Sequence, residues 1–157
     1  MECTFAPPAE ADALWMARAL EQARAAATEE EVPVGAVVVV GGALVAEGRN
    51  GTRTRNDPLA HAELVAVREA ATRVGWRLLD ATVYVTLEPC AMCAGAMVLA
   101  RVKRLVYAAA DPKTGMCGSL ECLVQDPRLN HRMEVTQGVL AQEAGELLRS
   151  FFRSRRP

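Results

Sequence analysis

Two short motifs carry the residue types of a metal site with an acid–base group beside it. The first is His61-Ala62-Glu63, and the second runs from Pro89 to Cys93 with the sequence PCAMC. Two cysteine thiolates and one imidazole supply three ligands to a tetrahedral zinc ion. They leave the fourth position to water, which marks a catalytic rather than a structural site. We therefore predict that His61, Cys90 and Cys93 hold zinc.

The spacing of the two cysteines favours their ionised form. Cys90 and Cys93 are three residues apart, so both sulfurs face the same side of a first helical turn. The unpaired N–H groups of that turn and the helix dipole stabilise thiolates. A zinc ion bound there would lower the pKa of its water ligand to about 7, which makes hydroxide accessible at neutral pH.

Each motif alone has an ordinary explanation. A Cys-x-x-Cys pair can be a redox couple or half of a structural zinc site, and His-x-Glu often marks no more than a helix start. Together, in this order and with proline before the first cysteine, the motifs form the signature of zinc-dependent nucleobase deaminases. The combination therefore favours hydrolytic removal of an amino group from a base.

Glu63 is the predicted proton carrier of this chemistry. Residues two apart on a regular helix point about 200° apart, so Glu63 does not simply join His61 as a ligand. We expect His61 to lie at or before a helix start, where its ring and the Glu63 carboxylate reach one cavity. Glu63 would then accept a proton from water and return protons to the attacked ring nitrogen and the departing amine.

The bulk composition is that of one globular domain, which we take as residues 1–157. About half of the residues are apolar (51%) and the formal net charge is −1, so composition alone does not indicate a nucleic-acid binder. Five cysteines are an odd number, which argues against a complete disulfide framework. Cys117 and Cys122 are then expected to be buried small apolar side chains.

The chain carries no visible targeting or membrane segment. Its first ten residues lack the basic and apolar regions of a signal peptide. The longest apolar stretch, 32–46, is interrupted by Pro33 and three glycines and is too short to span a bilayer. We therefore expect a cytoplasmic protein without contact to a membrane.

Hydrophobic periodicity and turn residues predict the elements that position these motifs. Helices are expected over 12–30, 61–74, 91–100 and 140–152, and strands over 34–40, 44–49, 82–87, 104–109 and 134–138. In the first helix, the apolar face is expected to include Leu14, Ala17, Leu20 and Ala25. Gly41-Gly42 predicts an antiparallel hairpin, and the later crossover helices favour parallel pairing. The predicted fold is three-layer α/β, with a central mixed five-stranded sheet and helices on both faces.

At these motifs the chain resembles the cytidine deaminase-like superfamily and, more narrowly, the bacterial tRNA-specific adenosine deaminases. The resemblance extends from about Trp15 to Arg156. It is carried by EVPVGAVVV at 31–39, DPLAHAE at 57–63, LLDATVYVTLEPCAMCAGAM at 78–97, DPKTG at 111–115, GSL at 118–120, NHR at 130–132 and LLRSFFRSRR at 147–156. It implies a cytidine deaminase-like fold and conversion of adenosine to inosine at the wobble position of a tRNA anticodon, typically of an arginine tRNA. It also implies a homodimer with one Zn²⁺ per subunit.

The same resemblance assigns roles to individual residues. His61, Cys90 and Cys93 match the zinc ligands, and Glu63 matches the proton shuttle. Asn50 matches a residue that contacts the target base, while Asp111 and Lys113 fall in a loop near the anticodon. Phe152 and the tail arginines match a helix that lines the RNA groove. Candidates for phosphate contacts are Arg53, Arg55, Lys113, Arg153, Arg155 and Arg156.

Departures from the family pattern lie on the RNA side of the site. Gly51-Thr52 follows Asn50 where Arg-Pro is more typical, Met116-Cys117 replaces small residues, and Ser150 stands where an acidic residue is common. Two alternatives share the metal signature. One is a free-nucleobase deaminase for guanine or cytosine. The other is a non-catalytic zinc- or RNA-binding module, in which Cys117, Cys122 or His131 would supply a fourth zinc ligand.

Overall fold

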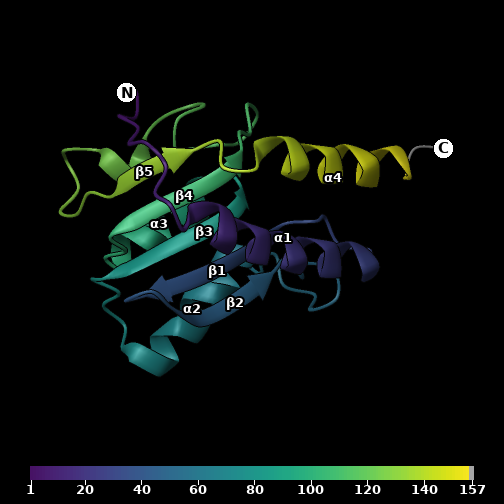
Figure 1. Cartoon of the computed structure of the whole chain (residues 1–157), viewed down its shortest axis with the longest axis horizontal. Coiled ribbons are helices and arrows are strands. Elements are labelled where there is room, and N and C mark those ends of the chain that lie inside the picture. The colour runs from purple at the N-terminus through teal and green to yellow at the C-terminus, as the bar shows by residue number, and fades with distance from the viewer. Residues whose placement is uncertain (156–157) are drawn as a thin grey trace.

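A mixed five-stranded sheet lies between two helical layers in the computed structural model, which describes residues 1–155 (Figure 1). The strand order is β2-β1-β3-β4-β5. The strands are β1 (Gly35–Val40), β2 (Ala43–Arg49), β3 (Ala81–Leu87), β4 (Arg104–Ala109) and β5 (Glu134–Gln137). The helices are α1 (Asp12–Thr28), α2 (Ala62–Val74), α3 (Ala91–Leu99) and α4 (Ala141–Arg153).

The two faces of the sheet carry separate hydrophobic clusters. One cluster joins α1 and α4 to side chains such as Val37 and Tyr84, and the other joins α2 and α3 to side chains such as Val38 and Val85. Because strand side chains alternate between faces, consecutive valines of β1 serve both clusters. The predicted three-layer fold is therefore confirmed.

Strand directions bring the carboxyl ends of four strands to one edge of the sheet. β1 pairs antiparallel with β2 and with β3, whereas β3–β4 and β4–β5 are parallel. Consequently β2, β3, β4 and β5 run the same way, and we call the edge where they end the carboxyl edge. Asn50, Glu88 and Asp111 follow strands there. Crevices outside the carboxyl ends of strands are the usual ligand sites of open α/β sheets.

The predicted hairpin and helix boundaries agree closely with the structure. Gly41 and Gly42 have φ of +59° and +76°, a left-handed conformation that glycine adopts without strain. α2 ends at Gly75, as expected. α1 ends two residues early, at Thr28, and a short 3₁₀ helix at Leu123–Gln125 was not anticipated.

The predicted apolar face of α1 was largely wrong. Leu14 is 67% exposed and Ala17 is exposed as well. Of the expected set, only Leu20 is fully buried, and the buried face is Asp12, Met16, Ala19, Leu20, Ala23 and Ala26. The helix is rich in alanine, so its hydrophobic periodicity has little contrast. The close approach to β1 at Gly35, whose added Cβ would lie 2.6 Å from Ala23 N, sets the rotation of the helix instead.

Asp12, at the start of α1, can be buried because side chains of the sheet donate hydrogen bonds to its carboxylate. Its carboxylate accepts hydrogen bonds from both terminal nitrogens of Arg104, at 2.7 and 2.6 Å, and from the Tyr84 hydroxyl at 2.9 Å. Arg104 also donates to the Thr136 hydroxyl. These bonds tie α1 to β3, β4 and β5.

Cys3 and Cys122 are joined by a disulfide, which corrects the expectation that Cys122 is only a buried apolar side chain. The bond anchors the N-terminal segment beside β5, where Phe5 forms an isolated bridge with Val135. Cys117 stays a free buried thiol, as expected.

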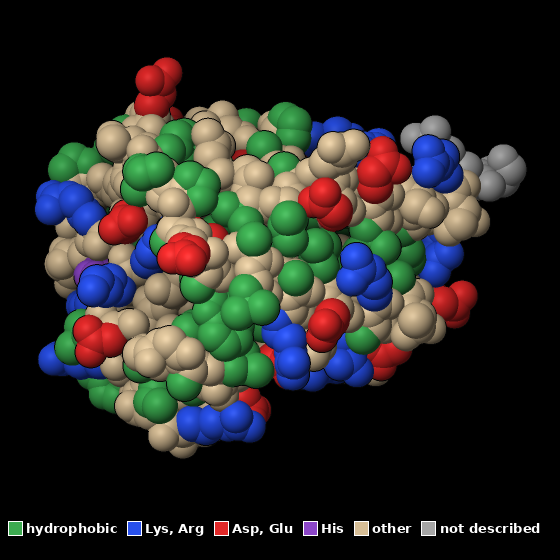
Figure 2. All heavy atoms as spheres, viewed as in Figure 1, with side chains coloured by type: hydrophobic (Ala, Val, Ile, Leu, Met, Phe, Trp, Pro, Cys, Tyr) green, Lys and Arg blue, Asp and Glu red, His purple; other side chains and the backbone are tan. Residues whose placement is uncertain are grey.

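The surface charge is mixed in sign, as the net charge of −1 leads one to expect. Figure 2 shows basic and acidic side chains interspersed over the face formed by α1 and α4. Among residues 1–155, each helix is either too short or too polar to cross a bilayer.

Candidate active site

His61 occupies the position expected of it, at the start of a helix. It is the N-cap of α2, with extended backbone angles (φ −78°, ψ 151°), and its carbonyl accepts the first helical hydrogen bond from Val65 N at 3.0 Å. The first turn of α2 lies directly on β2, because a Cβ added at Gly48 would be 2.5 Å from Ala62 O. This contact fixes where His61 and Glu63 enter the site.

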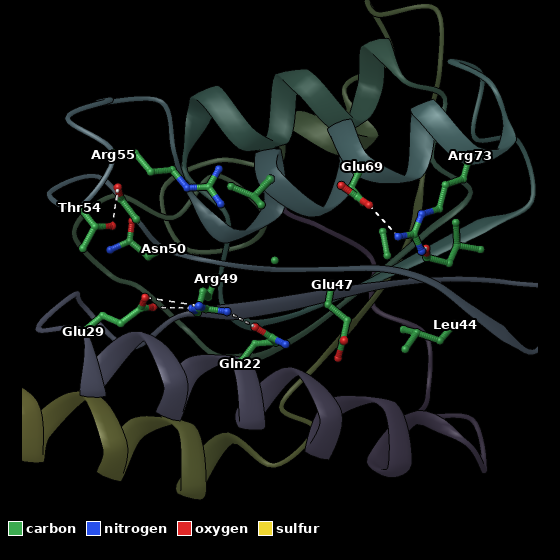
Figure 3. A pocket seen from close by; sticks show the side chains of 15 residues that line it. Gln22, Glu29, Leu44, Glu47, Arg49, Asn50, Thr54, Arg55, Glu69 and Arg73 are labelled. Carbon is green, nitrogen blue, oxygen red and sulfur yellow. Dashed lines mark hydrogen bonds and ion pairs between the residues drawn. The ribbon is translucent and has the colours of Figure 1, made fainter.

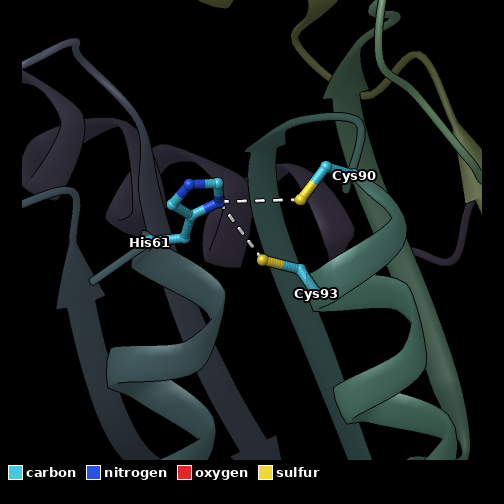
Figure 4. A group of neighbouring side chains, drawn as sticks. All are labelled: His61, Cys90 and Cys93. Atoms are coloured by element: carbon cyan, nitrogen blue, oxygen red, sulfur yellow. Dashed lines mark hydrogen bonds between the residues drawn. The ribbon is translucent and has the colours of Figure 1, made fainter. Parts of the chain in front are cut away.

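The two cysteines occupy the first turn of α3. Cys90 is its N-cap, also extended (φ −77°, ψ 178°), and Cys93 is fully buried one turn later. His61 Nδ1 lies 3.7 Å from Cys90 Sγ and 3.4 Å from Cys93 Sγ (Figure 4). The three ligand atoms all lie within 4.8 Å of one another, and within residues 1–155 no further His, Cys, Asp or Glu joins the group. One nitrogen and two sulfurs at this separation suit a tetrahedral zinc ion with a free position.

The three side chains of the cluster differ in how readily they lose a proton. Hydrogen bonds from Cys93 and His61 lower the pKa of Cys90 to about 3, so this sulfur is a thiolate at neutral pH. The hydrogen bond to Cys90 and burial raise the pKa of Cys93, and the bond to Cys90 raises the pKa of His61. In the metal-free cluster Cys90 therefore supplies the negative charge, whereas Cys93 is a neutral thiol that must lose its proton to bind zinc, so zinc binding should release protons.

Glu63 lies in the first turn of α2 and lines the same cavity as His61. The side chain is 4% exposed, and burial raises the pKa of its carboxyl group. The cavity has a volume of about 280 Å³. Its lining is Val32, Val34, Asn50, Thr52, His61, Ala62, Glu63, Leu87, Glu88, Cys90, Asp111 and Thr114. A buried carboxyl group with a raised pKa, beside the His61–Cys90–Cys93 group, can both accept and donate a proton.

Two predicted substrate residues, Asn50 and Asp111, line the cavity. Asn50 donates through Nδ2 to Val32 O at 3.3 Å, which fixes the orientation of its amide. Asp111 directs its carboxylate back into its own loop, where it accepts from the Thr114 hydroxyl at 2.7 Å and from the backbone N–H of Lys113 at 3.1 Å. Asp111 therefore shapes the wall of the cavity.

The other predicted RNA contacts lie outside the cavity lining. Lys113 is exposed on the 111–119 loop. α4 follows β5 at the carboxyl edge and extends away from the sheet (Figure 1). Near its end, Phe152 is 48% exposed, and the Arg155 guanidinium lies 4.0 Å from the centre of the Phe151 ring. Arg156 falls outside the described residues.

Two buried glutamates organise the loops around the site, and sequence reasoning did not identify them. Glu31 accepts hydrogen bonds from Thr54 N and from the Thr54 hydroxyl, at 2.7 and 2.9 Å, and from Arg53 N at 3.2 Å. Burial opposes ionisation of Glu31, yet these donors outweigh it and lower its pKa. Glu88 holds the 111–119 loop in a similar way. Its only signal in the sequence was its place between a strand and Pro89.

A larger groove, of about 450 Å³, lies along the β2 edge between α1 and α2 (Figure 3). Its charged side chains are mostly paired with one another: Arg49 with Glu29, and Arg73 with Glu69. Arg73 also donates to Val45 O at 2.6 Å and so covers the exposed edge of the strand. The groove lacks a cluster of metal ligands or unpaired acids, so the smaller cavity is the candidate active site.

A structural zinc site, enclosed by four protein ligands, would need a fourth ligand beside His61, Cys90 and Cys93. Residues 1–155 supply none. Cys122 is bonded to Cys3. The His131 ring lies within hydrogen-bond distance of Val102 O, with Nε2 2.6 Å away. Cys117 is not a member of the His61–Cys90–Cys93 group. The geometry therefore favours an open site.

Comparisons with known proteins show that the chain is similar to deaminases. A family model described as MafB19-like deaminase matches residues 10–156. The chain is 48% identical over 146 residues to the tRNA-specific adenosine deaminase of Bacillus subtilis, covering 92% of this chain and 91% of that protein. A structure from a study of A-to-I editing by tRNA:A34 deaminases superposes with a TM-score of 0.83 at 43% identity, covering 86% of this chain and 99% of the other. A guanine deaminase from Nitrosomonas europaea has a TM-score of 0.76 at 26% identity, covering 94% and 86%.

Proposed function

Because this chain belongs to the family of tRNA-specific adenosine deaminases, we propose that it hydrolyses adenosine to inosine at the wobble position of a tRNA anticodon. The observation that carries the proposal is that two members of the His61–Cys90–Cys93 cluster, His61 and Cys90, line one small cavity together with the buried Glu63. The reaction consumes one water molecule and releases ammonia. The protein must therefore bind the base, supply an activated water and move protons.

We propose that His61, Cys90 and Cys93 hold one Zn²⁺ per subunit. Zinc supplies Lewis-acid activation of water at neutral pH. Glu63 would accept one proton from the water and pass it to the attacked ring nitrogen of adenine. It would then carry the second proton, from the hydroxyl group added to the ring carbon, to the departing amine, so that both protons of the water are used and ammonia leaves. Its raised pKa, caused by burial, makes the protonated carboxyl group available for the second half of the cycle.

We further propose that the target base enters the cavity beside Asn50. The Asn50 amide group, oriented by its bond to Val32 O, can hydrogen-bond a purine edge. An adenine in an anticodon loop is already unpaired, so its transfer into the pocket costs less than from a duplex. The RNA outside the pocket would contact Asp111, Lys113, Phe152 and Arg155. An arginine tRNA is the expected substrate.

The assembly is proposed to be a homodimer of single-domain subunits, residues 1–157, acting in the cytoplasm. α3 contains no charged residue, and its partly exposed side is apolar: Met92, Gly95, Ala96 and Leu99, at spacings of three and four residues. Leu99 is 72% exposed. Such a face is suited to cover by a second copy. Sedimentation should give a mass twice that of one chain. Leu99→Glu should lower this mass toward that of a single chain.

The proposed activity is tested by incubating zinc-loaded protein with an arginine-tRNA anticodon stem-loop and sequencing the reverse-transcribed product. Inosine is read as guanosine, so adenosine should be read as G at the wobble position alone. Glu63→Ala is the matched control: it should retain zinc and lose at least about 100-fold in rate. Faster turnover of free guanine than of the RNA would instead establish the free-base alternative. If folded, zinc-loaded protein converts no adenosine in the RNA, the proposal is refuted.

A further inference from the structure

Glu88 is a buried carboxylate whose partners are all hydrogen-bond donors of one loop. The side chain is 2% exposed. Its Oε1 accepts from Asp111 N at 3.0 Å and from the Ser119 hydroxyl. Its Oε2 accepts from Cys117 N at 3.0 Å and from Ser119 N at 2.9 Å. Together the two oxygens therefore bind both ends of the 111–119 loop.

The same loop is tied to the backbone of the metal motif. Met116 N donates to Pro89 O at 2.9 Å, and Glu88 N donates to Ala109 O at 2.8 Å. Gly115 packs against the carboxylate so closely that an added Cβ would overlap it. The loop cannot shift without disturbing these contacts, and Glu88 directly precedes Pro89-Cys90.

The loop that Glu88 holds forms one wall of the cavity. Asp111 and Thr114 line the pocket together with Glu88 itself, and Asn50 and Glu63 line the same pocket. Lys113, the predicted RNA contact, lies on the same loop. The position of this wall relative to the metal ligands therefore depends on the Glu88 carboxylate.

From this arrangement, which rests on the proposed function, we propose that Glu88 is a positioning residue for the substrate. Its carboxylate holds the 111–119 loop at a fixed distance from the Cys90 turn, so that the pocket is shaped before RNA binds. Glutamine cannot replace it, because an amide nitrogen would face N–H or O–H donors where an acceptor is required. The four donors explain why an acid occupies a buried position with no cation paired to it in residues 1–155.

The test compares Glu88→Gln with Gly115→Ala, which disturbs the same contact from the loop side. Both variants should raise KM for the anticodon stem-loop by about tenfold or more, since bonds to a charged group are lost. kcat should fall less than KM rises, and zinc content should be unchanged. Their effects should not multiply in the double variant, because both act through one contact.

Asp126→Asn is the matched control. Asp126 also organises a loop, by accepting from Arg128 N at 2.9 Å and from its guanidinium, but near the opposite edge of the sheet, where the amino ends of β4 and β5 lie. Its KM should equal that of the wild type. Amide hydrogen exchange gives a readout independent of activity: Cys117 and Ser119 N–H groups should lose protection in Glu88→Gln and in Gly115→Ala, but not in Asp126→Asn.

The outcomes separate this inference from the proposed function. An inactive wild type would refute the function, while the exchange experiment would still report on the loop. An active wild type with unchanged KM in Glu88→Gln and Gly115→Ala would overturn the positioning role. If Glu88→Gln does not fold, Gly115→Ala decides the matter: a normal KM in that variant contradicts the proposal.

Discussion

Among single residues, the buried carboxyl groups differ in the direction in which their surroundings shift the pKa. Asp12 and Glu31 are surrounded by hydrogen-bond donors, which overcome the opposing effect of burial and lower their pKa. Burial instead raises the pKa of Glu63, the one that lies in the cavity beside the metal cluster. Carboxyl groups whose environments push their pKa values apart indicate different roles, structural for the first two and proton transfer for the third.

The environment of Asp12 predicts a pH dependence of stability. Burial opposes ionisation, but bonds from Arg104, Ala9 N and Tyr84 outweigh it, so the folded pKa lies below the ordinary value of 3.8. The stabilisation is complete above that value and is lost as pH falls through the folded pKa. Asp12→Asn should therefore lower the free energy of unfolding by about 3 kcal/mol at pH 7.

The difference between wild type and Asp12→Asn should shrink steadily below about pH 4, where the wild-type carboxyl group also becomes neutral. Urea unfolding, followed by tryptophan fluorescence, measures it. A difference that stays constant from pH 7 to pH 3 would show that the charge on Asp12 is not what stabilises the fold.

At the scale of helices and strands, close backbone contacts determine where functional side chains stand. α1 approaches β1 at Gly35, and α2 approaches β2 at Gly48, in each case without room for a Cβ. Only the second contact touches the turn that carries His61 and Glu63. The two glycines therefore offer the same steric perturbation on opposite faces of the sheet.

Gly48→Ala should weaken zinc binding, whereas Gly35→Ala should not. Both substitutions overpack a helix–sheet contact and should cost about 1–3 kcal/mol of stability. Gly48→Ala in addition pushes the first turn of α2 away from the cysteines of α3. Chelator competition measures the zinc affinity and urea unfolding the stability. Equal zinc affinity in two equally destabilised variants would contradict this reading of α2.

Most elements were predictable from sequence because their signals are local. The Gly41-Gly42 turn, the valines of β1 and the cap positions of His61 and Cys90 depend on neighbours in the chain. The burial of Asp12 and Glu88 was not predictable, since their donors come from Arg104, 92 residues away, and from a loop beginning 23 residues away. The Cys3–Cys122 disulfide was missed for the same reason.

The whole molecule places the His61–Cys90–Cys93 group and the start of the projecting helix α4 at the same edge of the sheet. β2, β3, β4 and β5 all end there, so the loops of the cavity and the start of α4 are neighbours in the topology. The net charge of −1 gives no overall attraction to RNA. Affinity must then come from local basic groups such as those at the end of α4.

Arg155→Ala should therefore reduce the salt dependence of stem-loop binding. If Arg155 contacts one phosphate, the slope of log K against log salt should fall by about 0.7–0.9. Arg77→Ala is the matched control, because Arg77 likewise stacks on an aromatic ring, that of Trp76 at 4.8 Å, but beyond the far end of α2. Binding titrations of the stem-loop at several salt concentrations measure this slope. The same slope in Arg155→Ala and Arg77→Ala would count against an RNA contact by Arg155.

The central claim is that one imidazole and two thiolates bind a zinc ion that keeps a position free for water beside Glu63. X-ray absorption at the zinc edge of the loaded protein tests it most directly. The account predicts two sulfur ligands at about 2.3 Å, one imidazole nitrogen at about 2.0–2.1 Å and a fourth oxygen ligand that exchanges with solvent. A shell with three sulfurs, or one filled by four protein ligands, would contradict it.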